Sequence, residues 1–149
     1  MIFETLLIGL VLAVIYVEVL DIYPGGIIVP GYIALYLNKP LMVVVTIICA
    51  LLSLGLYRLL KRYLILFGKR RFVLLVLLGV FWSQVMSFFL PRVIPPEAGA
   101  AAIGWLIPGL LANNLERQKF WLTLASMFIV AAAAYFIVEL MIFSGLVGR

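Results

Sequence analysis

Long apolar runs alternate with short polar connections along this chain. The runs cover residues 5–22, 41–60, 72–90 and 120–143. Each is close to the roughly 20 residues that an α-helix needs to cross the hydrocarbon core of a bilayer. We therefore expect an all-α, polytopic integral membrane protein with four long transmembrane helices. The connections are too short to hold a soluble domain, so residues 1–149 are predicted to form a single membrane domain.

A proline–glycine element interrupts the apolar pattern twice, 78 positions apart. The matching residues are Gly26, Pro30, Gly31 and Ala34 in the first copy and Gly104, Pro108, Gly109 and Ala112 in the second. Proline removes a backbone donor and clashes with the carbonyl four residues earlier, which here belongs to a glycine. We therefore expect two short, broken helical elements.

The duplication of this element favours an internal two-fold repeat, with repeats at about 1–60 and 72–143. Backbone groups freed at membrane depth must be covered by protein or water. Paired interruptions in two halves are typical of a central polar path, so the motif residues are candidates for lining one. A packing kink without any ligand is the alternative.

Positive charge gathers between the second and third apolar runs. Six of the eleven cations lie there: Arg58, Lys61, Arg62, Lys69, Arg70 and Arg71. By the positive-inside rule this loop faces the cytoplasm. The cluster is a candidate docking surface for an acidic protein face or a polyanion. Attraction to anionic lipid is the simpler explanation.

The broken elements leave two topologies open. If each dips into the membrane and returns, the chain has four spans and both termini are cytoplasmic. If each crosses, the chain has six spans, the halves form an inverted repeat, and both termini lie outside. The motif core of about a dozen residues is shorter than a straight span, which favours the four-span arrangement.

A few polar residues in or beside the apolar runs are further candidates. Glu18 and Asp21 lie three apart, so a helix places them on one face, either lining a path or at a wet span end. Glu139 lies within the last run and needs a partner or a proton if it is buried. Asn113 follows the second motif and is placed to cap a short helix or to contact polymer.

Small residues recur at four-residue spacing in the third run, at Gly79, Ser83 and Ser87. Such a stripe lets a second helix approach closely. We expect a helix contact there, within this chain or with another.

Several kinds of chemistry are excluded by composition. The chain has no histidine and a single cysteine, Cys49, so histidine metal sites, serine–histidine triads and internal disulfides are not expected. It carries no phosphate-binding loop and no dinucleotide fingerprint. No basic domain interleaved with aromatic residues indicates nucleic-acid binding. We therefore expect no cofactor, no metal and no catalytic residue in this chain.

Three sequence blocks resemble the PgsC/CapC family of poly-γ-glutamate biosynthesis proteins. They are the blocks at 24–35, with VPGYIAL, at 66–72, with GKRRF, and at 104–118, with IPGLLANN. The resemblance extends over nearly the full length, and only the stretch at 92–97 matches poorly.

The resemblance implies a function that the residues alone do not show. In that family a Mur-type amide ligase joins glutamates through the γ-carboxyl with ATP and Mg²⁺, and a further subunit faces outward. The C-type chain is the membrane subunit required with them. We therefore expect a multi-pass subunit of the cell membrane that anchors the ligase and assists synthesis and export of the capsule polymer.

Two other functions fit the same motifs. A stand-alone transporter of small organic anions would use duplicated proline–glycine breaks equally well. A pure assembly scaffold would need the helices but no path.

Overall fold

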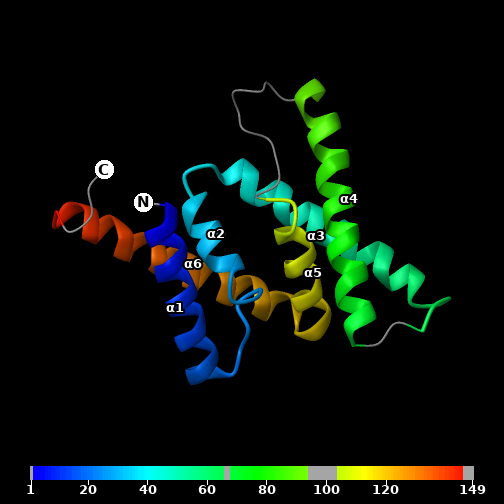
Figure 1. Ribbon diagram of the computed structural model, residues 1–149, viewed down its shortest axis with the longest axis horizontal. Coiled ribbons are helices and arrows are strands. Elements are labelled where there is room, and N and C mark those ends of the chain that lie inside the picture. The colour runs from blue at the N-terminus through cyan, green and yellow to red at the C-terminus, as the bar shows by residue number, and fades with distance from the viewer. Residues whose placement is uncertain (1, 66–67, 94–103, 146–149) are drawn as a thin grey trace. The chain divides into compact units, whose positions relative to one another are not determined.

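The computed structural model describes residues 2–65, 68–93 and 104–145, and these form six α-helices and no strand (Figure 1). In chain order they are α1 (Ile2–Leu20), α2 (Val29–Leu35), α3 (Pro40–Leu60), α4 (Lys69–Val93), α5 (Ile107–Arg117) and α6 (Phe120–Phe143). The predicted all-α class is confirmed. Among the described residues, α1, α3, α4 and α6 are long and apolar enough to cross a membrane, as the four apolar runs predicted.

The helices pack as two compact units. The first consists of α1, α2 and α6, and the second of α3, α4 and α5. In each unit two long helices and one short helix all contact one another. The packing units therefore differ from the predicted sequence repeats. The last helix of the first repeat, α3, packs with α4 and α5 of the second repeat, and the last helix of the second repeat, α6, packs with α1 and α2 of the first.

Facing glycines bring two helices together in each unit. Gly9 of α1 faces Gly31 of α2, and Gly79 of α4 faces Gly109 of α5. A Cβ added to Gly31 would lie 3.2 Å from the carbonyl oxygen of Leu6, and one added to Gly109 would lie 2.8 Å from that of Leu75. The backbones are thus too close to admit any larger residue. The helix contact predicted at Gly79 is confirmed, and its partner is the second proline–glycine motif.

The motif prolines begin helices and do not kink them. Pro30 and Pro108 lie in the first turns of α2 and α5, and the residues just before each helix lie outside any helix. The expected clash with the carbonyl four residues earlier is therefore wrong, because a first-turn N–H has no helical partner to lose. Gly26 and Gly104 have φ values of 114° and 61°, so each supplies a backbone conformation that side chains disfavour.

The short helices run back along the long ones. The chain leaves α1 at Leu20 and lies beside Gly9 by the time it reaches Gly31. In the second unit, α5 starts opposite Gly79, in the middle of α4, and continues toward the N-terminal end of α4 (Figure 1). Each short helix therefore lies along part of its long neighbour.

Candidate functional site

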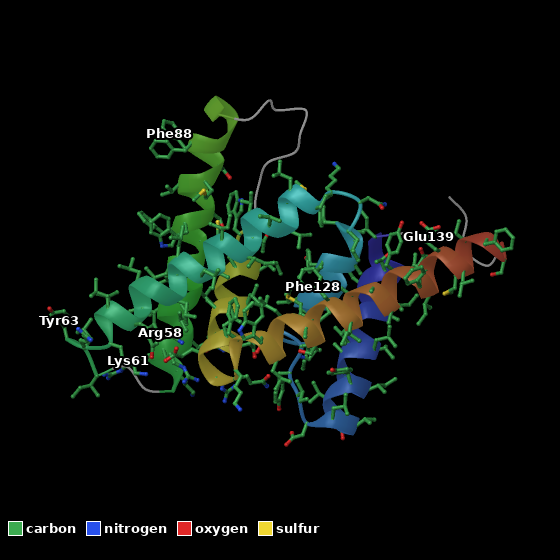
Figure 2. The ribbon with its side chains drawn as sticks, turned by 180° about the vertical axis from the view of Figure 1, so that it is seen from behind. Arg58, Lys61, Tyr63, Phe88, Phe128 and Glu139 are labelled. Atoms are coloured by element: carbon green, nitrogen blue, oxygen red, sulfur yellow. The ribbon has the colours of Figure 1, made fainter. Side chains whose placement is uncertain are left out.

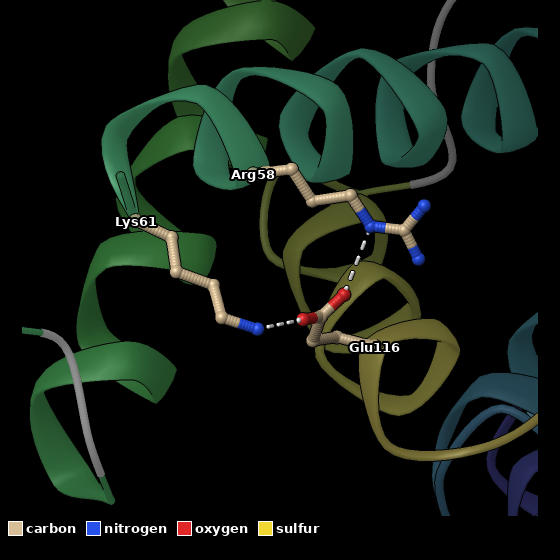
Figure 3. Close-up of polar contacts among 3 residues, drawn as sticks. All are labelled: Arg58, Lys61 and Glu116. Atoms are coloured by element: carbon tan, nitrogen blue, oxygen red, sulfur yellow. Dashed lines mark hydrogen bonds and ion pairs between the residues drawn. The ribbon is translucent and has the colours of Figure 1, made fainter. Parts of the chain in front are cut away.

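The basic end of the second unit contains an ion-pair cluster formed by Arg58, Lys61 and Glu116 (Figure 3). Arg58, in the last turn of α3, donates from Nε to Oε2 of Glu116 over 3.1 Å, and Lys61 donates from Nζ to Oε1 over 3.0 Å. Only 9% of the Glu116 side chain is exposed, whereas both cations are more than half exposed. The ion pairs hold the end of α5 against the end of α3. Since two cations share one carboxylate, the cluster keeps a net positive charge.

The environment of Glu116 favours its charged form. Burial raises the pKa of this carboxyl, but the hydrogen bonds from Lys61 and Arg58 outweigh burial and hold the pKa below its ordinary value. Because the folded-state pKa is depressed, the stabilisation is present above the unfolded-state pKa and is lost as pH falls through the folded one.

We expect the variant Glu116→Gln to lower the free energy of unfolding at pH 7 by about 1 kcal/mol, since both cationic partners are exposed and screened. Thermal unfolding of the purified protein in detergent, followed from pH 7 down to pH 3, measures the effect. The difference between parent and variant should shrink as the parent carboxyl takes up a proton. A difference that stays constant over this range would show that the charge of Glu116 does not stabilise the unit.

A cavity of about 510 Å³ lies beside this cluster, between the N-terminal turn of α4 and the last turns of α5. Its lining includes Gly68, Lys69, Arg71, Phe72, Asn113 and Arg117. Asn113 is only 8% exposed, and its Oδ1 has no hydrogen-bond partner among the described residues. The buried Nε of Arg71 has none either. The cavity thus joins three cations with one unpaired acceptor and one unpaired donor.

The comparisons with known proteins agree with the three sequence blocks. The family described as capsule biosynthesis CapC matches residues 8–124. This chain belongs to the CapC family. It is 30% identical over 131 residues to the PGA biosynthesis protein CapC of Bacillus subtilis (strain 168), covering 87% of this chain and 88% of that protein. It is 31% identical over 137 residues to the capsule biosynthesis protein CapC of Bacillus anthracis, covering 91% of each. No solved structure matches.

The motif residues of this CapC-family chain are mostly packed inside their units. The buried ones are Pro30, Gly31, Ala34, Pro108, Gly109 and Ala112. Gly26 is half-buried and Gly104 is exposed. The structure therefore gives the two central glycines a packing role in the helix contacts, while the transfer path stays a prediction.

The six predicted docking cations divide into two groups. Arg58 and Lys61 are committed to Glu116, and Figure 2 shows them with Tyr63 at the C-terminal end of α3. Arg62, Lys69, Arg70 and Arg71 form no ion pair with a carboxylate among the described residues. Of these, Lys69 and Arg71 line the cavity, whereas Arg62 and Arg70 do not.

The predicted acidic candidates lie elsewhere, in the first unit. Glu18 and Asp21 are exposed at the C-terminal end of α1, where Asp21 has a φ of 53° and its N–H bonds the carbonyl of Val17 over 2.8 Å. Glu139 is exposed near the C-terminal end of α6 (Figure 2). Its functional role stays a prediction, as do those of Glu18 and Asp21.

Sequence reasoning missed Glu116, because its partners Arg58 and Lys61 lie more than fifty positions earlier in the chain. Glu116 stands 78 positions after Asn38, and Arg58 stands 77 positions before Tyr135. In the first unit the hydroxyl of Tyr135 donates to Oδ1 of Asn38 over 3.1 Å. The first unit therefore links Asn38, which follows its short helix, to α6 through a neutral hydrogen bond, whereas the second unit links the end of α5 to α3 through an ion pair.

Proposed function

We propose that this chain is the membrane subunit of a poly-γ-glutamate synthase, which anchors the cytoplasmic amide ligase and assists synthesis and export of the polymer. The observation that carries the proposal is membership in a capsule biosynthesis family, combined with a cationic helix end where Glu116 is the one carboxylate that pairs with the cations among the described residues. Such a surface attracts an acidic partner or a polyanion.

The proposed complex divides the chemistry between subunits. ATP and Mg²⁺ belong to a Mur-ligase-like partner, because this chain carries no phosphate-binding loop. A third subunit faces outward and receives the polymer. This chain then acts as a non-catalytic, multi-pass component of the cell membrane, and its basic end meets the ligase.

The proposed topology has six crossings. Arg117, at the end of α5, lines the same cavity as Lys69 at the start of α4. Because α5 ends on the side where α4 begins, we count the return to that side as a further crossing. We propose this arrangement instead of the four spans that the sequence favours, and it would place both termini opposite the basic loop.

Removal of exposed cations outside the cavity is expected to weaken ligase recruitment. In the variant Arg62→Gln/Arg70→Gln, about 2 kcal/mol of electrostatic attraction to an acidic surface is lost, at about 1 kcal/mol per cation, by analogy with cations at anionic membranes. Co-purification of the tagged ligase with this subunit from solubilised membranes should fall by about tenfold or more.

The matched control is Lys39→Gln. Lys39 is also exposed, but it precedes α3, whose opposite end carries the basic cluster about 30 Å away. Ligase recovery should be unchanged in this control. Equal recovery from parent and double variant would contradict docking through this surface.

A pure assembly scaffold is the second candidate, favoured by the burial of the motif residues in helix contacts. A photo-crosslinking residue in place of Phe72, which is exposed beside the cavity, separates the two functions. If the subunit assists export, nascent polymer should form an adduct at this position. A scaffold should give adducts with the ligase at most.

A further inference from the structure

The cavity between α4 and α5 presents an unusual combination of groups for a helix contact. Three cations, Lys69, Arg71 and Arg117, line it, and none of the described lining residues carries a carboxylate. The first turn of α4 opens on the same space, and the free N–H groups of a helix N-terminus favour an anion. The charge of the cavity therefore selects a negatively charged ligand.

Asn113 adds a requirement that charge alone does not meet. Its side chain is 8% exposed and its Oδ1 lacks a donor among the described residues. Leaving a buried acceptor unpaired costs on the order of 1–3 kcal/mol. A ligand that brings an N–H group beside its negative charge would satisfy Asn113, whereas a simple anion would not.

The first unit shows that the fold does not need this amide. The position 78 residues before Asn113 is occupied by Leu35, at the C-terminal end of α2. Leu35 is half-buried, so an apolar side chain is accepted at the corresponding position of the first unit. Asn113 stands in its place in the unit that also carries the cationic cavity.

We propose that this cavity binds one γ-glutamyl unit of the polymer, an inference that rests on the proposed function. The α-carboxylate of the unit lies against Arg71, Lys69 and Arg117, and Nε of Arg71 gains the acceptor it lacks. The N–H of the γ-linked amide, one carbon away from that carboxylate, donates to Oδ1 of Asn113. A free volume of about 510 Å³ accommodates a unit of this size.

The ligand class follows from the pairing of groups. A γ-linked chain repeats a carboxylate and an amide N–H on the same carbon atom, which matches the adjacent cations and the unpaired acceptor. A carboxylate polymer without amides would satisfy the cations but leave Asn113 unpaired. The cavity should therefore discriminate between these two polyanions by the amide, and not by charge.

The test uses the full chain, purified in nanodiscs of neutral lipid, and a fluorescent γ-linked glutamate oligomer followed by anisotropy. Asn113→Leu installs the residue of the first unit and is expected to weaken oligomer binding by about tenfold, as loss of a buried hydrogen bond predicts. Arg117→Gln should weaken it as well. Lys39→Gln removes the same charge at the opposite end of α3 and should change binding by less than about twofold.

Three further measurements decide the interpretation. Thermal unfolding of Asn113→Leu should be unchanged or slightly raised, which excludes misfolding as the cause of weaker binding. Polyacrylate should bind parent and Asn113→Leu equally. Equal oligomer binding by parent and variant, or complete displacement of the oligomer by vesicles containing phosphatidylserine, would overturn the assignment and identify a non-specific or lipid site.

The test of oligomer binding can succeed or fail independently of the test of ligase docking. Ligase co-purification should be the same for parent and Asn113→Leu, because the exposed Arg62 and Arg70 are intact. Loss of oligomer binding with normal ligase recovery supports the polymer site. Normal oligomer binding by Asn113→Leu with lost ligase recovery in Arg62→Gln/Arg70→Gln supports docking and rejects the assignment of Asn113.

Discussion

The variant Gly79→Ala is expected to lose about 3 kcal/mol of unfolding free energy, the upper part of the usual range for overpacking. A Cβ at position 79 would overlap the backbone of Gly109 and approach the carbonyl carbon of Pro108 to 3.3 Å. Backbone atoms cannot rotate away as a flexible side chain can, so α4 and α5 must separate. Thermal unfolding in detergent, or resistance to proteolysis in membranes, measures the loss.

A matched glycine provides the control. Gly55 lies inside α3 and has open space around it, with no heavy atom of another residue within 4 Å of the place that a Cβ would occupy. Gly55→Ala should therefore stabilise the protein slightly, by about 0.5–1 kcal/mol, because alanine restricts the unfolded chain and favours the helix. If Gly79→Ala and Gly55→Ala behaved alike, the close approach of α4 and α5 would be disproved.

The repeat predicts the same result at a second place. Gly9 meets Gly31 in the first unit as Gly79 meets Gly109 in the second. Gly9→Ala should thus be as damaging as Gly79→Ala.

The second large effect concerns membrane topology. With six crossings, a cysteine at position 119 should be labelled from the same side of the membrane as a cysteine at position 62, by a reagent that does not cross the bilayer. With four spans it should be labelled from the opposite side. The reason is that Arg117 lies beside Lys69, and Lys119 follows two residues later.

The chain is well suited to this experiment. Its single native cysteine, Cys49, is buried in α3 and gives little background. Lys39→Cys serves as the reference for the other side, because both topologies place it opposite the basic loop. Labelling of positions 119 and 39 from one common side would reject six crossings and restore the re-entrant arrangement.

The long helices were readable from sequence because each is a local property. An apolar run of about twenty residues has few other stable forms in a bilayer, and the predicted runs agree with α1, α3, α4 and α6 within a few residues. The duplicated motif could also be read from short stretches of sequence, since Pro30 and Pro108 stand in matching strings. Membership in the CapC family rested on those same strings and is confirmed.

The action of the prolines was misjudged because their effect depends on where a helix starts. In a continuous helix Pro108 would have broken a hydrogen bond, but α5 begins one residue earlier, so nothing is lost. The sequence does not reveal this start, since the residue preceding the helix, Leu106, offers no side-chain cap. The glycine before the motif, Gly104, was the better guide, because its positive φ marks the turn.

By itself, the sequence determined the membrane class, the four long helices, the duplicated motif and the family, because hydropathy and short motifs act over neighbouring residues. Only the tertiary structure decided that each short helix packs through its glycine onto one long helix, that Glu116 joins Arg58 and Lys61, and that Asn113 lies in a cationic cavity. These contacts connect residues that lie tens of positions apart, and no local pattern selects among the partners that a helix surface could meet.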